Sequence, residues 1–217
     1  MDERDHRSSR FSAAASWLHT HWQDGTPFLA IYTTIFLLIF VWPQGTPAFW
    51  IWICLPVYFT HQFEEYLWPG GFMAMLTQRF STQHGTDPNV PLLTDREAYW
   101  INVGIIWVLF TVSAVFAMVI DPAWGLWVPC FTVLNGLSHA AAWIPDHQYN
   151  PGLAVSLALN IPVGTIAALI LISSGIGSVL AWTASILIAV GLMAFIARYA
   201  MYRSRSRRQS GSETDPA

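Results

Sequence analysis

The sequence predicts an all-α protein, a polytopic transmembrane helical bundle of six spans with a short N-terminal interfacial amphipathic helix. Of its 217 residues, 54% are hydrophobic and only 11% are charged, whereas soluble domains have about a quarter of their residues charged. Long apolar runs alternate with short breakers rich in Pro and Gly, which is typical of membrane helices and their turns. The basic residues provide a third observation, because all 10 are arginines that six spans place on one side of the membrane.

The chain divides into three segments. Residues 1–26 form a cytoplasmic N-terminal segment, in which apolar residues from Phe11 to Trp22 recur at helical spacing and predict the interfacial helix. Residues 27–202 form the transmembrane domain. Residues 203–217 are rich in Arg and Ser, and we expect them to form a disordered cytoplasmic tail. The six spans are expected at residues 27–42, 46–67, 97–120, 123–144, 152–174 and 178–202.

The arginines orient this bundle. They precede the first span, lie in the loop after the second, and end or follow the last, whereas the three short loops opposite carry none. Positive residues mark the cytoplasmic side of a membrane, so we expect an inner (cell) membrane protein with both termini in the cytoplasm. The lipid bilayer is therefore the expected partner. The cluster Arg203–Arg208 indicates topology rather than nucleic-acid binding.

Three ionisable residues, His61, Glu64 and Glu65, lie close together at the end of the second span. Residues three and four apart share one face of a helix, so all three can point the same way. Such groups are costly at the margin of a bilayer and usually serve a function. The sequence therefore predicts a buried polar site at the cytoplasmic end of the bundle.

The fourth span supplies the expected partners of this cluster. Asn135 and His139 are four residues apart, hence on one face, and we predict them as site residues together with His61, Glu64 and Glu65. Further polar residues gather at the same end of the neighbouring spans and in the loop between the fourth and the fifth. These supporting candidates are Asn102, His147, Tyr149, Asn150 and Asn160.

Two blocks of this chain resemble a family of bacterial integral membrane proteins named for its HXXEE motif. The first block is His61-Gln62-Phe63-Glu64-Glu65, followed by Tyr66 and Pro69-Gly70-Gly71. The second contains Asn135, His139 and the run Tyr149-Asn150-Pro151-Gly152. The resemblance implies that these residues belong to one site, and it implies no particular reaction.

The composition of the cluster favours a metal-dependent membrane enzyme acting on a lipid-like or small apolar substrate. Histidine and carboxylate are the usual ligands of zinc, iron and manganese, and the predicted ligands are His61, Glu64, Glu65 and His139. Adjacent residues diverge by about 100° around a helix, so Glu64 and Glu65 cannot both easily reach one ion.

Other functions remain open. Two carboxylates in a desolvated site can differ in protonation, which suits a metal-free acid/base isomerase, cyclase or hydrolase. A small transporter or a non-catalytic membrane binding protein is a further alternative, although no inverted repeat is evident. The cluster could also simply tie helix ends together, but a single Asn would do so at a lower desolvation cost.

Overall fold

The described part of the chain is helical, with connecting turns and loops and without a strand. The computed structural model describes residues 13–145 and 147–212, with side chains through Gln209. Residues 13–21 are helical and are followed by a short 3₁₀ turn, Trp22–Gly25. The remaining α-helices are α2 (Thr26–Phe36), α3 (Ala48–Trp52), α4 (Cys54–Tyr66), α5 (Phe72–His84), α6 (Asp95–Tyr99), α7 (Val108–Val119), α8 (Trp127–Trp143), α9 (Leu153–Val155), α10 (Ile161–Ser173) and α11 (Val179–Ser212).

Several of these helices join end to end into longer rods. A π-helical segment, Trp100–Trp107, connects α6 to α7, and a second one, Ser156–Asn160, connects α9 to α10. A third π-helical segment, Leu37–Val41, extends α2. The rod formed by α3 and α4 is interrupted at Ile53, three residues before Pro56, whose missing N–H leaves the preceding turn one hydrogen bond short.

Among the described residues, four helical segments are long and apolar enough to cross a membrane, which confirms the prediction of an all-helical membrane protein but not the count of six spans. They are Ala13–Gln44, Asp95–Val119, Leu153–Ser173 and Val179–Gln209. The other two rods lack that combination of length and apolarity. Helix α8 has 17 residues, or about 26 Å at 1.5 Å per residue, and α4 carries the polar cluster.

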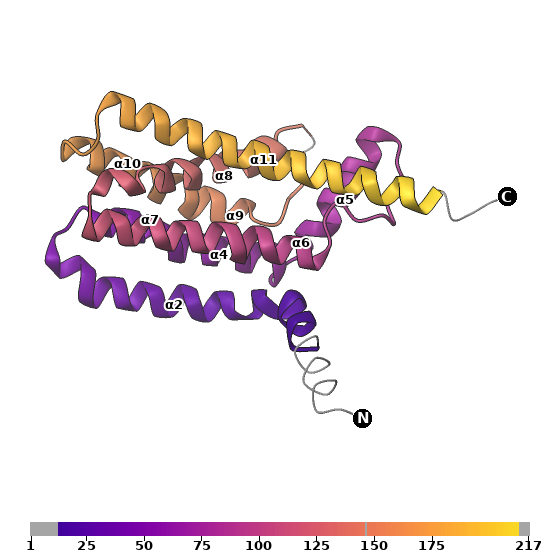
Figure 1. The fold of residues 1–217 in the computed structure, drawn as a ribbon, viewed down its shortest axis with the longest axis horizontal. Coiled ribbons are helices and arrows are strands. Elements are labelled where there is room, and N and C mark those ends of the chain that lie inside the picture. Colours follow the sequence, from indigo (N-terminus) through magenta and orange to yellow (C-terminus); the bar gives the residue numbers. More distant parts are fainter. Residues whose placement is uncertain (1–12, 146, 213–217) are drawn as a thin grey trace, which may run out of the picture.

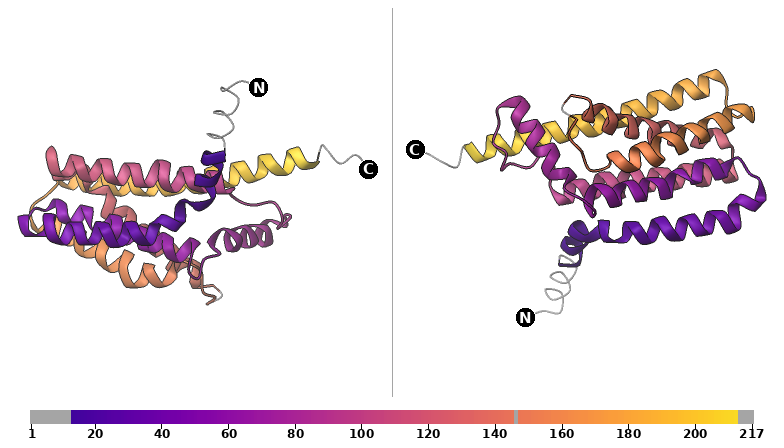
Figure 2. Two further views of the ribbon diagram at one scale, coloured as in Figure 1. Left: turned by 90° about the horizontal axis from the view of Figure 1, so that it is seen from below. Right: turned by 180° about the vertical axis from the view of Figure 1, so that it is seen from behind.

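The rods lie roughly side by side in one bundle (Figure 1). Helix α2 packs against α4 at one edge, and α11 packs against α8 at the other, with α10 also on α8. The first residues of α2 and the last residues of α11 lie at the same end of the bundle. Two further views show α5 at that end as well (Figure 2).

Aromatic side chains form the centre of the core. Phe110 of α7 is 1% exposed and contacts Tyr58, Trp127 and Phe131, with ring centroids 5.4, 5.2 and 5.6 Å away. Trp127 also donates from Nε1 to Ser113 Oγ over 2.8 Å, so the indole N–H is satisfied within the core. These contacts fix α4, α7 and α8 against one another, directly beside the polar cluster.

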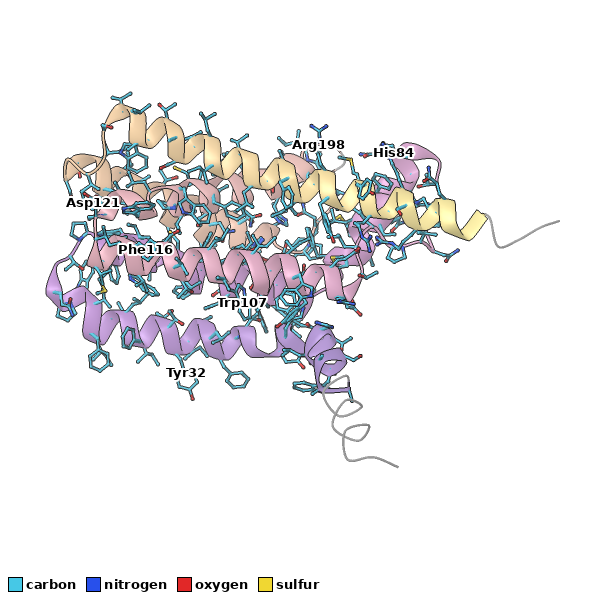
Figure 3. The ribbon with its side chains drawn as sticks, viewed as in Figure 1. Tyr32, His84, Trp107, Phe116, Asp121 and Arg198 are labelled. Atoms are coloured by element: carbon cyan, nitrogen blue, oxygen red, sulfur yellow. The ribbon has the colours of Figure 1, made fainter. Side chains whose placement is uncertain are left out.

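The outer faces of the bundle are apolar. Tyr32 of α2 points away from the bundle (Figure 3) and is 69% exposed, and the neighbouring Phe28 is 63% exposed. On α11, Leu180 and Leu187 are 78% and 65% exposed. Such a continuous apolar surface suits the hydrocarbon of a bilayer.

The prediction of a disordered tail from residue 203 is wrong for residues 203–212, because α11 continues through Ser212. Arg203 and Arg207 lie one turn apart and both bind Glu97, at 2.6 and 2.8 Å. Arg207 also donates to the carbonyl of Leu92, and Arg208 to that of Asp87. The sequence suggested a disordered tail, whereas these arginines hold the 87–92 loop against the helix. Residues 213–217 lie outside the described residues.

We expect Glu97→Gln to release the end of α11. The Glu97 side chain is 7% exposed and binds two arginines, so neutralising it removes the anchor that holds residues 203–212. Trypsin should then cleave after these arginines at least about tenfold faster, because local opening becomes easier. Asp95→Asn is the matched control, since Asp95 lies in the same first turn of α6 and is exposed. Equal cleavage rates in the two variants would contradict the anchoring role.

Candidate functional site

The polar cluster forms where α4, α8 and α9 meet. His61 and Glu65 lie one turn apart on α4, and His139 projects from α8. All three side chains are buried, with exposed fractions of 1%, 7% and 5%. The structure thus brings together the histidines of both predicted blocks around one glutamate.

The Glu65 carboxylate lies between the two imidazoles. Its Oε1 atom is 3.3 Å from His61 Nε2 and 3.3 Å from His139 Nε2. The two rings are 4.7 Å apart between centroids and nearly perpendicular, at 82°. One ligand atom from each of the three residues lies within 4.8 Å of the others, which is the compactness that a single metal ion requires.

Asn150 determines which nitrogen of His139 faces the glutamate. Its Nδ2 donates to the His139 carbonyl oxygen at 3.1 Å, so its Oδ1 must be the atom 2.7 Å from His139 Nδ1. His139 Nδ1 is therefore the protonated nitrogen and donates this bond. In the neutral imidazole, the Nε2 lone pair then points at Glu65. Histidine ligands in metal sites are oriented in this way, by a carbonyl oxygen that accepts from the other ring N–H.

His61 is held by Asn135 and Ser156. Asn135 Nδ2 donates to His61 Nε2 over 2.9 Å, and Ser156 Oγ lies 3.5 Å from His61 Nδ1. A nitrogen that accepts from an amide carries a lone pair rather than a proton. With His139 neutral, both imidazole nitrogens near Glu65 are acceptors, so the three groups share a volume that favours a cation.

Gly152 provides the space that this arrangement needs. It has a φ of +98°, and a Cβ atom there would lie 2.6 Å from His139 Cε1 and 2.7 Å from His61 Cε1. The backbone of the loop before α9 therefore approaches both rings at a distance that only glycine allows.

Glu64 does not join the two histidines. Its Oε1 accepts from the Ala154 N–H at 2.9 Å, and its Oε2 from the Val155 N–H at 2.6 Å. The Tyr149 hydroxyl also donates to Glu64, and loss of solvation together with this bond raises the pKa of the Tyr149 phenol. Glu64 therefore satisfies the first N–H groups of α9, and it lies outside the compact group of His61, Glu65 and His139.

Asn102 belongs to a neighbouring network. Its Oδ1 accepts from Tyr58 and Gln62 at 3.1 and 2.8 Å, and its Nδ2 donates to Tyr66 at 3.0 Å. Gln62 in turn accepts from Trp107 Nε1 at 2.7 Å. This network ties α4 to the rod of α6 and α7 and lies beside the histidines, with the Tyr58 ring centroid 6.1 Å from that of His61.

The structure leaves two predicted supporting residues apart from the cluster. His147 lies in the exposed loop with its ring 4.6 Å from that of Trp143. Asn160 is fully buried near Gly136 of α8, and neither of its side-chain polar atoms has a hydrogen-bond partner among the described residues. The roles of the predicted site residues as ligands or catalytic groups stay predictions.

A cavity of about 370 Å³ opens beside Glu65. One wall carries polar side chains from α4, the rod of α6 and α7, and α8, including Glu65, Asn102 and Asn135. The other walls are apolar and come from α5, residues 92–93 and α11. A ligand-sized apolar pocket with a few convergent polar groups is typical of small-molecule sites.

Sequence reasoning gave no role to the uncharged residues that shape this site. Gln62 and Gly152 were named only as members of the two blocks, Ser156 was not named, and the apolar cavity walls are ordinary helix residues. Of these residues, Gly152 could have been found from the sequence, because a glycine directly after Asn150-Pro151 often adopts a positive φ. The others depend on which helices meet, which a local pattern does not state.

The comparisons with known proteins add one finding. The family described as proteins of unknown function with an HXXEE motif matches residues 52–167, just over half of the 217-residue chain. The match contains His61, Glu65, His139 and Gly152. No curated protein and no solved structure matches the chain. The chain therefore belongs to the family of proteins of unknown function with an HXXEE motif.

Proposed function

We propose that this protein is a metal-dependent membrane enzyme acting on a lipid-like or small apolar substrate. His61, Glu65 and His139 bind one divalent transition metal, zinc, iron or manganese. The observation that carries the proposal is the convergence of three buried acceptor atoms within 4.8 Å of one another. Such acceptors repel one another unless a cation lies among them.

The donor set fits a catalytic rather than a structural ion. Two histidines and one carboxylate are the protein ligands of several zinc hydrolases and of non-haem iron oxygenases. Three protein ligands leave positions for water or substrate, where the bound ion supplies Lewis acidity. Glu65 and Asn135 both line the cavity, so a substrate in it lies next to the ligand cluster.

Asn150 and Asn135 orient the two histidine ligands. Asn150 fixes the tautomer of His139, and Asn135 Nδ2 lies 2.9 Å from His61 Nε2. Asn135 is positioned to orient a polar group of the substrate once the metal takes the His61 lone pair. Glu64 and Tyr149 hold the start of α9, which keeps Gly152 against both rings.

The proposal includes a topology of six spans with both termini in the cytoplasm of the inner membrane. The six rods are α2, α3–α4, α6–α7, α8, α9–α10 and α11. The arginines among the described residues support it, because they lie on α5, α6 and the second half of α11. Arg198 lies towards the end of the bundle that contains α5, and Asp121 lies at the opposite end (Figure 3).

Metal analysis tests the proposal. We expect the purified wild-type protein to bind about one equivalent of metal, and His61→Ala and His139→Ala to bind at least about 100-fold more weakly, because each removes a ligand. His147→Ala is the matched control, since His147 is exposed and outside the cluster. Metal-free wild-type protein after incubation with zinc, iron and manganese would refute the metal-dependent function.

One observation favours a second candidate, metal-free acid/base chemistry. A proton on His139 Nε2 would donate to Glu65 and take the place of the metal. His139 and Glu65 then form an acid/base pair, which Asn150 orients through His139 Nδ1. An isomerase, cyclase or hydrolase of this type would retain activity after chelation. The metal-dependent enzyme would lose it and regain it when the ion is restored.

A further inference from the structure

We infer that the cavity beside Glu65 binds a single-chain lipid alcohol, an amphiphile with one apolar chain and an uncharged hydroxyl head. The inference rests on the proposed function, since it names the substrate class of the same site. It depends on the size of the cavity, on the side chains that line it and on where it opens.

The volume and the apolar walls fit one hydrocarbon chain. An apolar cavity of 150 Å³ holds benzene, so a cavity of about 370 Å³ has room for on the order of a dozen carbon atoms. Its walls include Leu76 and Met73 of α5, Leu93, and Met193, Ile196 and Met201 of α11. Methionine and leucine side chains adapt well to flexible apolar ligands.

The charge of the lining selects the head group. Glu65 is the one charged side chain that lines the cavity, and no Arg, Lys or His is among the lining residues of the described chain. Phosphate and carboxylate heads are bound by cationic side chains, and the lining supplies none, so an anionic head meets the Glu65 carboxylate with only the proposed metal as its counter-charge. The lining therefore favours an uncharged head.

The hydrogen-bonding capacity of the polar wall suits a hydroxyl group. Glu65 and Asn135 Oδ1 are acceptors, and Asn135 Nδ2, which contacts His61, becomes a free donor once the metal takes the His61 lone pair. Asn102 already makes bonds through both of its side-chain polar atoms. A hydroxyl group satisfies this wall because it donates to Asn135 or Glu65 and keeps its own lone pairs for the metal.

The opening of the cavity lies beside α11. Ala197 of α11 and Ser138 of α8 both line the cavity and are exposed, so the space reaches the surface between α8 and α11, a helix apolar enough to cross a membrane. A lipid alcohol dissolved in the bilayer can therefore enter sideways without passing through water.

A photoreactive analogue of 1-dodecanol with a diazirine in its chain tests this inference in lipid nanodiscs. We expect labelling of cavity residues on α5 and α11, removed by excess 1-dodecanol but not by dodecanoate. Ala197→Phe fills the opening and should lower the labelling at least about tenfold. Ala194→Phe is the matched control, since Ala194 is exposed on the same helix but does not line the cavity.

The outcomes separate this inference from the proposed metal function. Labelling that dodecanoate removes as well as dodecanol does overturns the uncharged head, and this comparison needs only wild-type protein. Equal labelling of Ala197→Phe and Ala194→Phe overturns the location of the binding site in the cavity. Metal content is measured on the same samples, and labelling should persist after chelation. Protein that contains metal but is not labelled refutes the lipid alcohol as ligand and leaves the metal function standing. Protein that is labelled but contains no metal refutes the metal function and leaves the ligand standing.

Discussion

Gly152→Ala is expected to abolish metal binding and to destabilise the protein by about 2–5 kcal/mol. The alanine has to adopt a φ of +98°. Its methyl carbon would lie 2.6 Å from His139 Cε1 and 2.7 Å from His61 Cε1, so it collides with both imidazoles. A non-glycine residue at positive φ costs about 1–2 kcal/mol, and overpacking adds about 1–3 kcal/mol. The rings must move away from Glu65 to relieve the collision. Metal stoichiometry and chemical unfolding in detergent measure the two effects.

Gly71→Ala separates the two causes. Gly71 also precedes a helix, with φ 88° and ψ 6° against φ 98° and ψ −13° for Gly152, and a Cβ atom at Gly71 meets nothing within 4 Å. The control should therefore lose only about 1–2 kcal/mol and keep its metal. If Gly152→Ala keeps a full complement of metal, then contact with the imidazoles does not determine the geometry of the site.

The sequence predicted the parts of this structure that follow from local pattern. Apolar runs between Pro and Gly breakers predicted helices, and helical spacing predicted that His61 and Glu65 share a face. The four-residue spacing of Asn135 and His139 likewise placed both on the inner face of α8, where they meet His61. These inferences succeed because a helix fixes the direction of its side chains independently of its neighbours.

The parts that failed depend on which elements meet. Glu64 and Glu65 are chemically identical in the sequence, yet the position of α9 commits Glu64 to two backbone N–H groups. The arginines after residue 202 were predicted to lie in a disordered tail, whereas Glu97, more than 100 residues earlier, binds and orders them. The cavity combines residues of α5 and α11 that share no sequence signal. Long-range packing, rather than local propensity, decides each case.

The two glutamates of the motif should give opposite results when each is changed to glutamine. Glu65→Gln should lose the metal, because an amide is a poor ligand for a transition metal between two imidazoles. In the presence of chelator its unfolding free energy should change little, since the polar partners of Glu65 among the described side chains are the two histidines. Metal analysis and chemical unfolding in chelator, performed on the same preparations, provide the two measurements.

Glu64→Gln should instead keep the metal-binding residues and lose stability. The new NH₂ group faces a backbone N–H of α9, so one buried donor is left without an acceptor, at a cost of about 1–3 kcal/mol. The carboxylate that bound two N–H groups and the Tyr149 hydroxyl also loses its charge-assisted bonds. Chelated Glu64→Gln should therefore unfold more easily than chelated Glu65→Gln, although it binds more metal. If both variants lose metal equally and unfold equally, the two carboxylates act as one unit, and the division of labour that places Glu65 in the site and Glu64 at the helix is wrong.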